Sequence, residues 1–447
     1  MGSKKRSLRK KVSLGLTAAL MTASLTALPP AQPAEAFDLA SAIGAVIGVS
    51  AQYAALNKQI AYFDGEGRNA YMNQVKDKEG VNDDPQANAM LDRVMSRLST
   101  AIAKTDPDIE KEPYNYFVNN NTNFNAYCTL GHNVSVNIGL FDTLNYNEDE
   151  IAFVLGHEMG HGQRKDPANG VKKNMPISLL AAIAESQSNG LEALGTALLA
   201  NLGSAKLVTL PMEKKADELG FTYASDANYN PGAGSALWQR VIEKMGTSKE
   251  TFLGSVFNPS DHPGNESRRD KYTERMYAYS GNRVNVDKKT GDILLNKKAV
   301  GIPAATDSMS ARERSYLVAG RLARIYHDEP EANYNASTDG ESLYFGSTPI
   351  MTLTESDNGE TWVTNLNTAA AIKDPKAEKA RQEAKAKEEK ARKAAEAKAE
   401  KAKQKELKKA KDQQKSAETT STQPSGKTFK ERVAELQKQQ SLLRDER

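Results

Sequence analysis

Hydrophobic positions along this chain recur at two different spacings. Between Pro85 and Ala103 the apolar side chains fall three and four residues apart, which is the spacing of one face of an α-helix. Residues 114–118 and 132–138 instead alternate and are rich in β-branched side chains, as strands are. The pattern therefore predicts a core helix followed by a short sheet.

Four further helices are predicted after this sheet. The first covers residues 148–163, with Asn147 as its N-cap and Glu150 as the return partner in a capping box. The others cover a stretch around Glu213 that runs to about residue 224, residues 231–245, and a segment that carries Arg268. Together these elements predict an α+β fold in which helices surround a small sheet.

The pattern changes from residue 281 to residue 372. Short strand-like segments alternate with turns, and residues 310–327 have helical spacing. We predict a second, small α+β domain here, and it shows no convincing catalytic constellation. Its expected strands are residues 284–286, 292–295, 343–345, 349–353 and 360–363.

Both ends of the chain have biased compositions. Residues 1–36 combine a basic start, an apolar stretch and the small-residue site Ala34-Glu35-Ala36, which predicts a secretory signal peptide. Residues 373–415, rich in Lys, Glu and Ala, predict a solvated single helix, and residues 416–447 a linker with a terminal amphipathic helix. The apolar stretches 39–55 and 177–207 are too short or too interrupted to span a membrane, which favours a soluble protein with surface attachment left open.

Composition narrows the classes of protein further. The net charge of the 447 residues is only +3, so no global field indicates binding to nucleic acid. The single cysteine, Cys128, rules out a disulfide framework within the chain. We expect Cys128 to be a small buried apolar residue.

The most informative motif is His157-Glu158-Met159-Gly160-His161. Residues four apart share one face of a helix, so both imidazoles can bind a single metal ion while Glu158 takes a proton from a bound water. The alternative is a surface helix that happens to carry two histidines. The apolar run 151–155 before the motif argues against it, because buried histidines need partners.

A hydrolytic zinc site uses three protein ligands and keeps one position for water. Glu213 and Asp217 lie four residues apart in the next predicted helix, and the small Ala216 between them allows close helix packing, as Gly160 does in the motif. We assign Glu213 as the third ligand of one Zn²⁺ ion per chain. Asp217 would hydrogen-bond a ligand histidine or a catalytic group. The alternative is an ordinary charged helix face.

These motifs together resemble the CAAX-prenyl-protease/HtpX-type zinc metallopeptidases, and most closely their exported, soluble BepA-like members. H-E-x-x-H is followed by E-x-x-A-D-x-x-G, and Asn125-Ala126-Tyr127 with the glycine-containing strand after it resembles the family's strand pair before the active helix. The resemblance covers roughly residues 37–279 and implies a mainly helical zincin core of the minigluzincin type over residues 37–280. One departure is His132, where the family usually has a second glycine.

The resemblance also implies roles for residues outside the two zinc helices. His262, Pro263 and Arg268 match the family's H-P-x-x-x-x-R element. His262 would contact the oxyanion or gate the zinc, or else be a structural loop histidine. Arg268 would fix that loop through an ion pair or contact the substrate. By resemblance Asp217 would be a proton donor, whereas its position favours a supporting role.

The predicted function is that of an exported zinc metalloendopeptidase of the periplasm or cell envelope. Its substrates would be unfolded or misassembled polypeptides, bound as an added strand along residues 125–136, with Asn125 and Ala126 in contact. One alternative is an envelope chaperone or assembly factor with a gated or idle zinc site. Another is a structural envelope protein that works through its charged C-terminal helix. The sequence does not indicate an oligomeric state.

Overall fold

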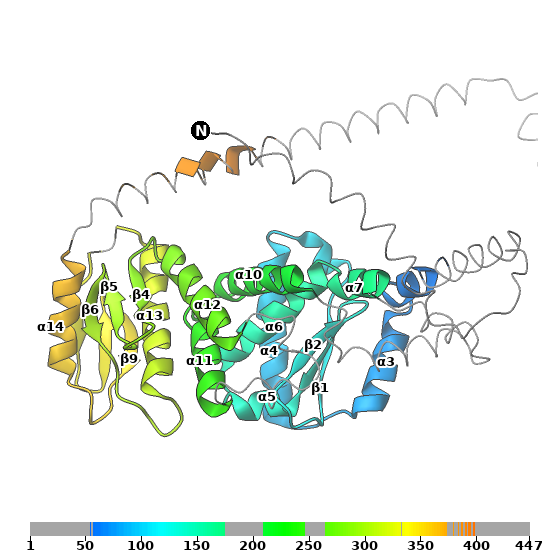
Figure 1. The fold of residues 1–447 in the computed structure, drawn as a ribbon, viewed down its shortest axis with the longest axis horizontal. Helices are drawn as coiled ribbons and strands as arrows, with labels where there is room; N and C mark the ends of the chain where they lie inside the picture. Colours follow the sequence, from blue (N-terminus) through cyan, green and yellow to red (C-terminus); the bar gives the residue numbers. More distant parts are fainter. Residues whose placement is uncertain are drawn as a thin grey trace, which may run out of the picture.

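The computed structural model describes residues 54, 57–174, 209–245, 264–331 and 333–372, together with scattered positions between 379 and 397. Figure 1 shows two regions side by side, one built around the sheet of β1 to β3 and the other around β4 to β9. The predicted signal peptide, most of residues 373–447 and the apolar stretch 177–207 lie outside the described residues. Within the described part, no helix is both long and apolar enough to cross a membrane.

The first region is a three-stranded sheet between helices (Figure 1). Its strand order is β1-β3-β2, with β1 parallel and β2 antiparallel to the central β3. Phe117 and Tyr127 point to one face, toward α3, whereas Val118, Ala126 and Cys128 point to the other, toward α4 and α6. Because both faces are covered, β2 and β3 are buried along their whole length.

The bounds of the elements in this region follow the predicted pattern closely. The helix expected over residues 85–103 and the motif helix expected over residues 148–163 are both confirmed without a shift. The elements are α3 (Arg68–Glu79), α4 (Pro85–Ala103), η1 (Pro107–Glu110), β1 (Asn115–Asn119), β2 (Ala126–Thr129), β3 (Asn133–Asn137), α5 (Ile138–Thr143), α6 (Glu148–Gln163), α7 (Asp166–Asn174), α10 (Leu210–Asp226), α11 (Ala233–Met245) and α12 (Asn265–Tyr279).

Helices α6 and α10 touch through small residues. A Cβ atom added to Gly156 would lie 3.1 Å from the carbonyl oxygen of Gly220, and one added to Gly160 would lie 3.2 Å from that of Ala216. Small residues four apart on each helix thus let the two backbones meet, as predicted for Gly160 and Ala216. The close approach of the two backbones sets the distance between the side chains that flank these small residues on α6 and α10.

The start of α6 corrects one prediction. Asn147 does cap the helix, because its side chain accepts a hydrogen bond from the backbone N–H of Glu150. The Glu150 carboxylate does not return to Asn147, however. It pairs with Arg240 of α11 at 3.0 and 3.2 Å, because a fully buried carboxylate gains more from a buried cation than from a backbone N–H.

The second region contains the same β-β-β-α unit twice. The first unit is β4 (Val284–Val286), β5 (Ile293–Leu295), β6 (Lys298–Gly301) and α13 (Ala311–Asp328), and the second is β7 (Ala336–Thr338), β8 (Ser342–Phe345), β9 (Thr348–Thr352) and α14 (Gly359–Ala370). Each unit forms an antiparallel three-stranded sheet in sequence order. In both units the strand register shifts within the middle strand, after Ile293 in β5 and after Leu343 in β8.

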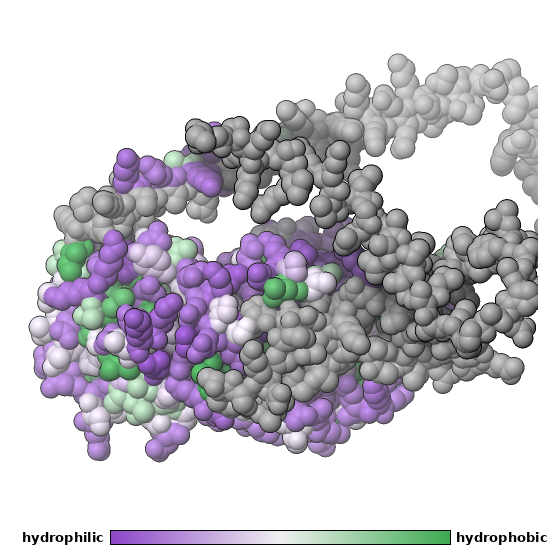
Figure 2. Space-filling model, in the orientation of Figure 1, coloured by the Kyte–Doolittle hydropathy of each residue, from purple (hydrophilic) through white to green (hydrophobic). Residues whose placement is uncertain are grey.

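The two units exchange helix contacts. Asn365 of α14 donates to the carbonyl oxygen of Val300 in β6, and Arg321 of α13 donates to that of Ile350 in β9. Val300 and Ile350 hold equivalent positions in the two units, so each helix binds the last strand of the other unit. Figure 2 shows only small apolar patches on this face, between larger hydrophilic areas.

One predicted strand in this region is wrong. Residues 360–363 begin α14, because the side chain of Asn358 caps the backbone N–H of Thr361 and the buried residues Trp362, Leu366 and Ala369 follow at helical spacing. A short window of β-branched and aromatic residues suggested a strand there. Strands β6 and β7 were not predicted, because each is short and only one of its residues is fully buried.

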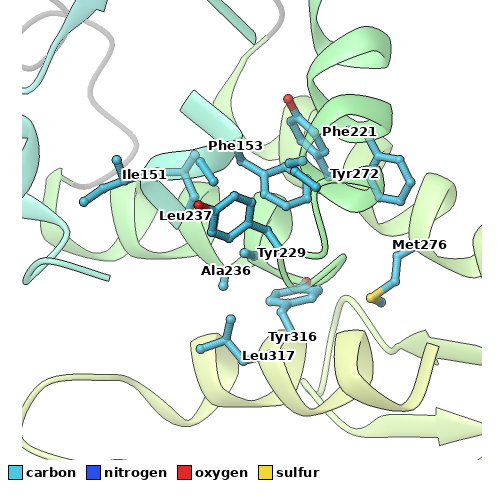
Figure 3. Packing of buried hydrophobic residues seen from close by; sticks show 14 of the residues in the cluster. Ile151, Phe153, Phe221, Tyr229, Ala236, Leu237, Tyr272, Met276, Tyr316 and Leu317 are labelled. Carbon is cyan, nitrogen blue, oxygen red and sulfur yellow. The ribbon is translucent and has the colours of Figure 1, made fainter. Parts of the chain in front are cut away.

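A single hydrophobic cluster joins the two regions (Figure 3). Tyr316 and Leu317 of α13 belong to the same buried cluster as Phe153 of α6 and Tyr229, which precedes α11. Beside it, the buried Arg240 reaches Glu150 of α6 and also Glu313 of α13, at 2.9 Å. The helix that carries the motif is therefore tied directly to the duplicated region.

Candidate metal centre

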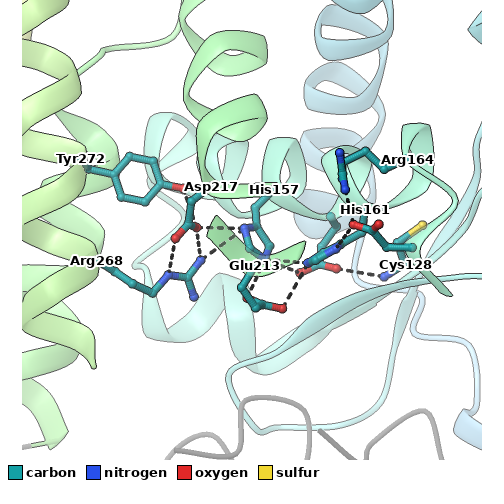
Figure 4. A network of polar contacts seen from close by, with 10 residues as sticks. Cys128, His157, His161, Arg164, Glu213, Asp217, Arg268 and Tyr272 are labelled. Atoms are coloured by element: carbon teal, nitrogen blue, oxygen red, sulfur yellow. Dashed lines mark hydrogen bonds and ion pairs between the residues drawn. The ribbon is translucent and has the colours of Figure 1, made fainter. Parts of the chain in front are cut away.

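Three buried side chains meet where α6 and α10 touch (Figure 4). His157 and His161 bring their Nε2 atoms within 3.2 Å of each other. The Glu213 carboxylate lies 3.2 Å from His161 Nε2 and 3.5 Å from His157 Nε2. All three residues are at most 5% exposed. Within the described residues, this is the group of three or more His, Cys, Asp and Glu side chains that could hold a metal ion.

The spacing of these atoms fits a tetrahedral metal ion. Ligand atoms about 2.0–2.1 Å from zinc lie about 3.3 Å apart when the angles between them are tetrahedral. The three separations of 3.2, 3.2 and 3.5 Å match that value. Two imidazoles and one carboxylate also leave a fourth position for water or substrate. The residues present therefore fit a zinc ion of the hydrolytic kind.

Each imidazole is held from behind by a carboxylate. Asp217 of α10 lies 2.9 Å from Nδ1 of His157, and Asp166 at the start of α7 lies 3.0 Å from Nδ1 of His161. Both carboxylates are buried, and Asp166 also accepts from Nε of Arg164 at 3.2 Å. Such contacts fix the tautomer and the ring orientation, so that both Nε2 atoms face the same point.

The electrostatics of the site favour a cation. Burial alone would lower the pKa of His161, but the hydrogen bonds to Asp166 and Glu213 raise it to about 10. Burial opposes the charge of Asp217 too, yet Arg268 and His157 hold the pKa of that carboxyl well below its usual range. A site that stabilises a proton so strongly on a buried histidine also attracts a metal cation, because the same negative charge stabilises both.

Glu158 lies beside the three donors without joining them. Its Oε1 atom is 4.0 Å from Nε2 of His157, and its Oε2 accepts a hydrogen bond from the backbone N–H of Cys128 at 3.0 Å. Burial raises the pKa of Glu158, and the neighbouring histidines oppose that shift. A carboxylate held this way, with a raised pKa next to a metal position, suits a group that accepts a proton.

Arg268 completes the wall on the other side (Figure 4). Its guanidinium pairs with both oxygens of Asp217, and Tyr272 donates to the same carboxylate at 3.1 Å. The guanidinium also stacks on the ring of Trp238, 4.0 Å from the ring centroid. Asp217 is thus held on three sides and cannot turn away from His157.

The predicted substrate strand is corrected in part. Strand β3 is central and cannot accept a peptide, whereas β2 is an edge strand. The carbonyl oxygen of Asn125 accepts from Asn137 next to β3, so alternation turns the main chain of Ala126 and Cys128 toward α6. Cys128 is already bound to Glu158. Ala126 is left as the main-chain position of β2 that faces the centre.

The position of His132 explains its departure from the family pattern. Its φ of 54° lies in the left-handed region, which favours glycine. The ring stacks on Tyr114 with centroids 4.6 Å apart, and the Tyr114 hydroxyl lies 2.8 Å from the carbonyl oxygen of Met159 in the motif. His132 therefore supports α6 from behind. His262, in contrast, lies outside the described residues.

Sequence reasoning missed several residues around the centre. Asp166 carried only a weak signal, as an acidic residue shortly after the motif. Tyr272 and Trp238 belong to no motif, yet they contact Asp217 and Arg268 and hold them in position. The Cys128 contact to Glu158 uses a backbone N–H, which no side-chain pattern can reveal. Cys128 itself is buried, as expected.

Comparison with known proteins gives one family match and several relatives. Residues 85–276 match the model of peptidase family M48. The chain is 24% identical over 230 residues to a putative beta-barrel assembly-enhancing protease of Vibrio cholerae, which covers 49% of this chain and 44% of that protein. It is 28% identical over 182 residues to the metalloprotease LoiP of Escherichia coli, covering 41% and 70%.

A third relative is more distant in origin. The mitochondrial metalloendopeptidase OMA1 of Arabidopsis thaliana is 30% identical over 148 residues, which is 32% of this chain and 28% of that protein. The matches thus span less than half the length of the Vibrio and Arabidopsis relatives. The family match includes both motif helices, and the matches confirm the resemblance drawn from the motifs. The part of the chain that carries the His157, His161 and Glu213 group belongs to peptidase family M48.

Proposed function

We propose that this protein is a zinc-dependent endopeptidase that cleaves unfolded or misassembled polypeptides in the cell envelope. The observation that carries the proposal is the buried His157, His161 and Glu213 group, whose donor spacing fits zinc, with Glu158 beside it. The family of residues 85–276 supports the reaction class. The name of the Vibrio relative supports proteolysis linked to beta-barrel assembly, and the name of the Escherichia relative supports metalloprotease activity.

The organisation and location of the protein belong to the same proposal. Residues 37–280 would form the peptidase domain and residues 281–372 an accessory domain. The residues 1–36 would direct export to the periplasm or the cell envelope, where the chain's single cysteine needs no partner. The charged stretch after residue 373 would be a spacer. Contact with the membrane surface is left open.

In this proposal His157, His161 and Glu213 hold the zinc, and Asp217 and Asp166 orient the two imidazoles. Bound there, zinc would supply a Lewis acid that lowers the pKa of a water molecule toward ~7 and polarises a carbonyl group. Glu158 takes the proton of the attacking water and returns it to the leaving amine. Burial of Glu158 suits both steps, since its raised pKa stabilises the protonated form between them.

The remaining residues position the substrate and the ligands. The main chain of Ala126 would pair with an extended peptide, and Asn125 would bind beside it. Arg268 would hold Asp217 in place, which favours a positioning role over proton donation by Asp217. His262 keeps the roles predicted from the resemblance, either contact with the oxyanion or gating of the zinc.

A single substitution tests this function. Replacing Glu158 by Gln keeps the size of the side chain and removes the base, so cleavage of an unfolded protein such as casein should fall by about 10²–10⁴-fold with zinc content unchanged. Glu148→Gln on the same helix is the matched control, because Glu148 contacts Arg93 away from the centre. Unchanged cleavage in the Glu158 variant would contradict the proposal.

The same variant separates the enzyme from an assembly factor. The name of the Vibrio relative couples a protease with beta-barrel assembly, and this observation favours a role in assembly beyond cleavage. If the cell needs only binding, Glu158→Gln should support envelope function as well as the natural protein. If it needs cleavage, the variant should behave like a deletion.

A further inference from the structure

Helix α13 of the duplicated region is connected to both helices of the candidate metal centre. The residues of α13 that make these connections fall three and four positions apart, so they share one face of the helix. The helix has 18 residues and is therefore about 27 Å long at ~1.5 Å per residue, so this face is long enough to serve two separate contacts. The residues of this face are Glu313, Leu317, Gly320 and Arg324.

The first connection lies at the start of α6. Arg240 of α11 pairs with Glu150 in the first turn of α6 and with Glu313 in the first turn of α13, at 3.0 and 2.9 Å. One turn further along α13, the side chain of Asn230 donates to the carbonyl oxygen of Leu317, while its backbone N–H donates to the carboxylate of the residue before Glu150. Arg240 and its two carboxylate partners are at most 3% exposed, so water does not compete with these pairs.

The second connection lies at the end of α10. Arg324 donates to the carbonyl oxygen of Ser225, in the last turn of α10, and to that of Tyr229 just after it, both at 2.8 Å. A cation at this end of a helix also complements the helix dipole. One turn before Arg324, a Cβ atom added to Gly320 would lie 2.7 Å from the Cα atom of Gly232, so α13 touches the backbone that follows α10 directly.

The contact between α6 and α10 resists sliding of one helix along the other only weakly. The helices meet at Gly156, Gly160, Ala216 and Gly220, where the backbones touch and few side chains can interlock. The donor atoms of the metal centre, however, have to keep their separations of 3.2 to 3.5 Å. Because metal–ligand distances tolerate changes of only about 0.2 Å, contacts elsewhere have to hold the two helices in register.

Helix α4 supplies such contacts on another side of the two helices. Arg97 lies 3.5 Å from Glu148 of α6 and donates to the carbonyl oxygen of Ala227 after α10. The Arg97 side chain is 42% exposed, and ion pairs in contact with water hold side chains only weakly. The buried connections are those to α13, and α13 lies after the end of the family match at residue 276.

We propose that α13 fixes the register of α6 against α10, and that Arg324 is a positioning residue for the candidate metal centre. The inference rests on the proposed metal site and gives the duplicated region a part in it. Arg324 lies at the opposite end of α10 from Glu213, so it acts through the helix and touches neither metal nor substrate. Without Arg324, α10 shifts along α6 and Glu213 leaves the point on which both imidazoles converge.

Arg321 on the same helix is the matched control. It also donates to a backbone carbonyl oxygen, but to that of Ile350 in β9, within the duplicated region. Replacing either arginine by Met keeps the length of the side chain and removes its charge and its donors. A difference between the two variants at the metal centre therefore reports on the contact of Arg324 with the end of α10.

The first experiment measures metal binding. Arg324→Met should lower zinc affinity by at least ~10-fold, as the loss of other residues that orient ligands does, and should change the spectrum of the cobalt-substituted protein. Arg321→Met should change neither. Arg324→Lys should restore most of the affinity, because an ammonium group can donate to both carbonyl oxygens. Natural zinc affinity in Arg324→Met, or an equal loss in Arg321→Met, overturns the inference.

The second experiment needs no metal. In the zinc-free protein, the backbone amides of residues 156–161 and 213–220 should exchange hydrogen at least ~5-fold faster in Arg324→Met than in Arg321→Met, because loosened helices open more often. Equal exchange rates in the two variants would mean that α13 does not hold the two helices together.

These measurements keep the inference apart from the proposed function. If the natural protein binds zinc but cleaves no polypeptide, the endopeptidase proposal fails and the zinc affinities still decide the role of Arg324. If it binds no zinc, the proposed function fails and hydrogen exchange decides. If it cleaves polypeptides and the two Met variants behave alike in both experiments, the proposed function stands and the inference about α13 is wrong.

Discussion

The two regions of the molecule use their interiors in opposite ways. The region that carries the candidate metal centre buries five charged or titratable residues within one small volume, each at most 5% exposed: His157, Glu158, His161, Glu213 and Asp217. Among the described residues from 282 to 371, the buried charged side chains are Glu313 and Arg314. The interior of the first region keeps buried charges close together, which costs folding free energy, whereas the interior of the second region is mainly apolar.

This difference shows what each region is built to do. Buried charges weaken a fold unless each is paired. The region with the metal centre therefore surrounds its charges with Arg268, Asp166 and the backbone of β2. The duplicated region has only Glu313 and Arg314 to pair among its described residues, with Arg240 and Asp357, and it repeats one simple packing unit. The buried Arg240 pairs with Glu150 of one region and with Glu313 of the other, so it connects the two interiors. The following predictions test how separate they are.

The largest effect is expected at the third ligand. Glu213→Gln should weaken zinc binding by well over ~100-fold, since removing a residue that merely orients a ligand already costs 10–100-fold. Competition with a chromophoric chelator measures the affinity. Glu218→Gln is the control on the same helix, because Glu218 is exposed and pairs only with Lys215. Equal affinities for the two variants would remove Glu213 from the ligand set.

The next effect concerns a residue that the motifs did not reveal. Asp166→Asn should lower zinc affinity by about 10–100-fold, because the amide holds the His161 ring less firmly and adds no charge. The spectrum of the cobalt-substituted protein should also change, since the ring orientation alters the ligand field. Asp108→Asn, at an exposed position, should change neither. A spectrum like that of the natural protein would make Asp166 purely structural.

A smaller effect tests the contact between the regions. Burial raises the pKa of Glu150 from its ordinary 4.5 to about 7, and Arg240 opposes that shift. Because the pKa of Glu150 is raised in the folded protein, the protonated Glu150 side chain favours the fold. This stabilisation is complete below about pH 4.5 and is lost as the pH rises through 7. Glu150→Gln should therefore flatten the decline in unfolding free energy between pH 5 and 8, by on the order of 1–2 kcal/mol.

Urea unfolding at several pH values measures that decline. Glu218→Gln again serves as the control, because it makes the same chemical change at an exposed position of the same region. A slope that is equally steep in the Glu150 variant would mean that the pair with Arg240 keeps Glu150 ionised throughout.

The smallest effect is expected in the duplicated region. Asn358→Ala removes the cap of α14 and should lower the unfolding free energy by about 1 kcal/mol. Zinc affinity should stay the same, because α14 packs mainly against the strands β6 and β7 of its own region. A change in zinc affinity would show that the two regions are coupled more tightly than their separate interiors indicate.

The fold was predictable where one signal was long and consistent. Helix α4 spans 19 residues with regular apolar spacing and a Pro after its cap, so its bounds could be read from the sequence. The short strands β6 and β7 gave too few residues to show a period. A strand was predicted at the start of α14 because Thr361, Trp362 and Val363 favour strands locally. The N-cap and the helical spacing of Trp362 with Leu366 make this segment a helix instead.

The candidate site was predictable where its geometry is local. His157, His161 and Glu158 share one helix, so their spacing alone fixes their arrangement. Glu213 needed a second helix, and the small Ala216 signalled how close it could come. Asp166 and Trp238 depend on turns and on packing between distant segments, and neither leaves a spacing that sequence reasoning can detect.

The crossed contacts of α13 and α14 make the two units of this region depend on each other. A lone β-β-β-α copy would lack the helix that covers its last strand, and its open edge would invite pairing. Two identical copies could satisfy each other by trading helices, as in a swapped homodimer.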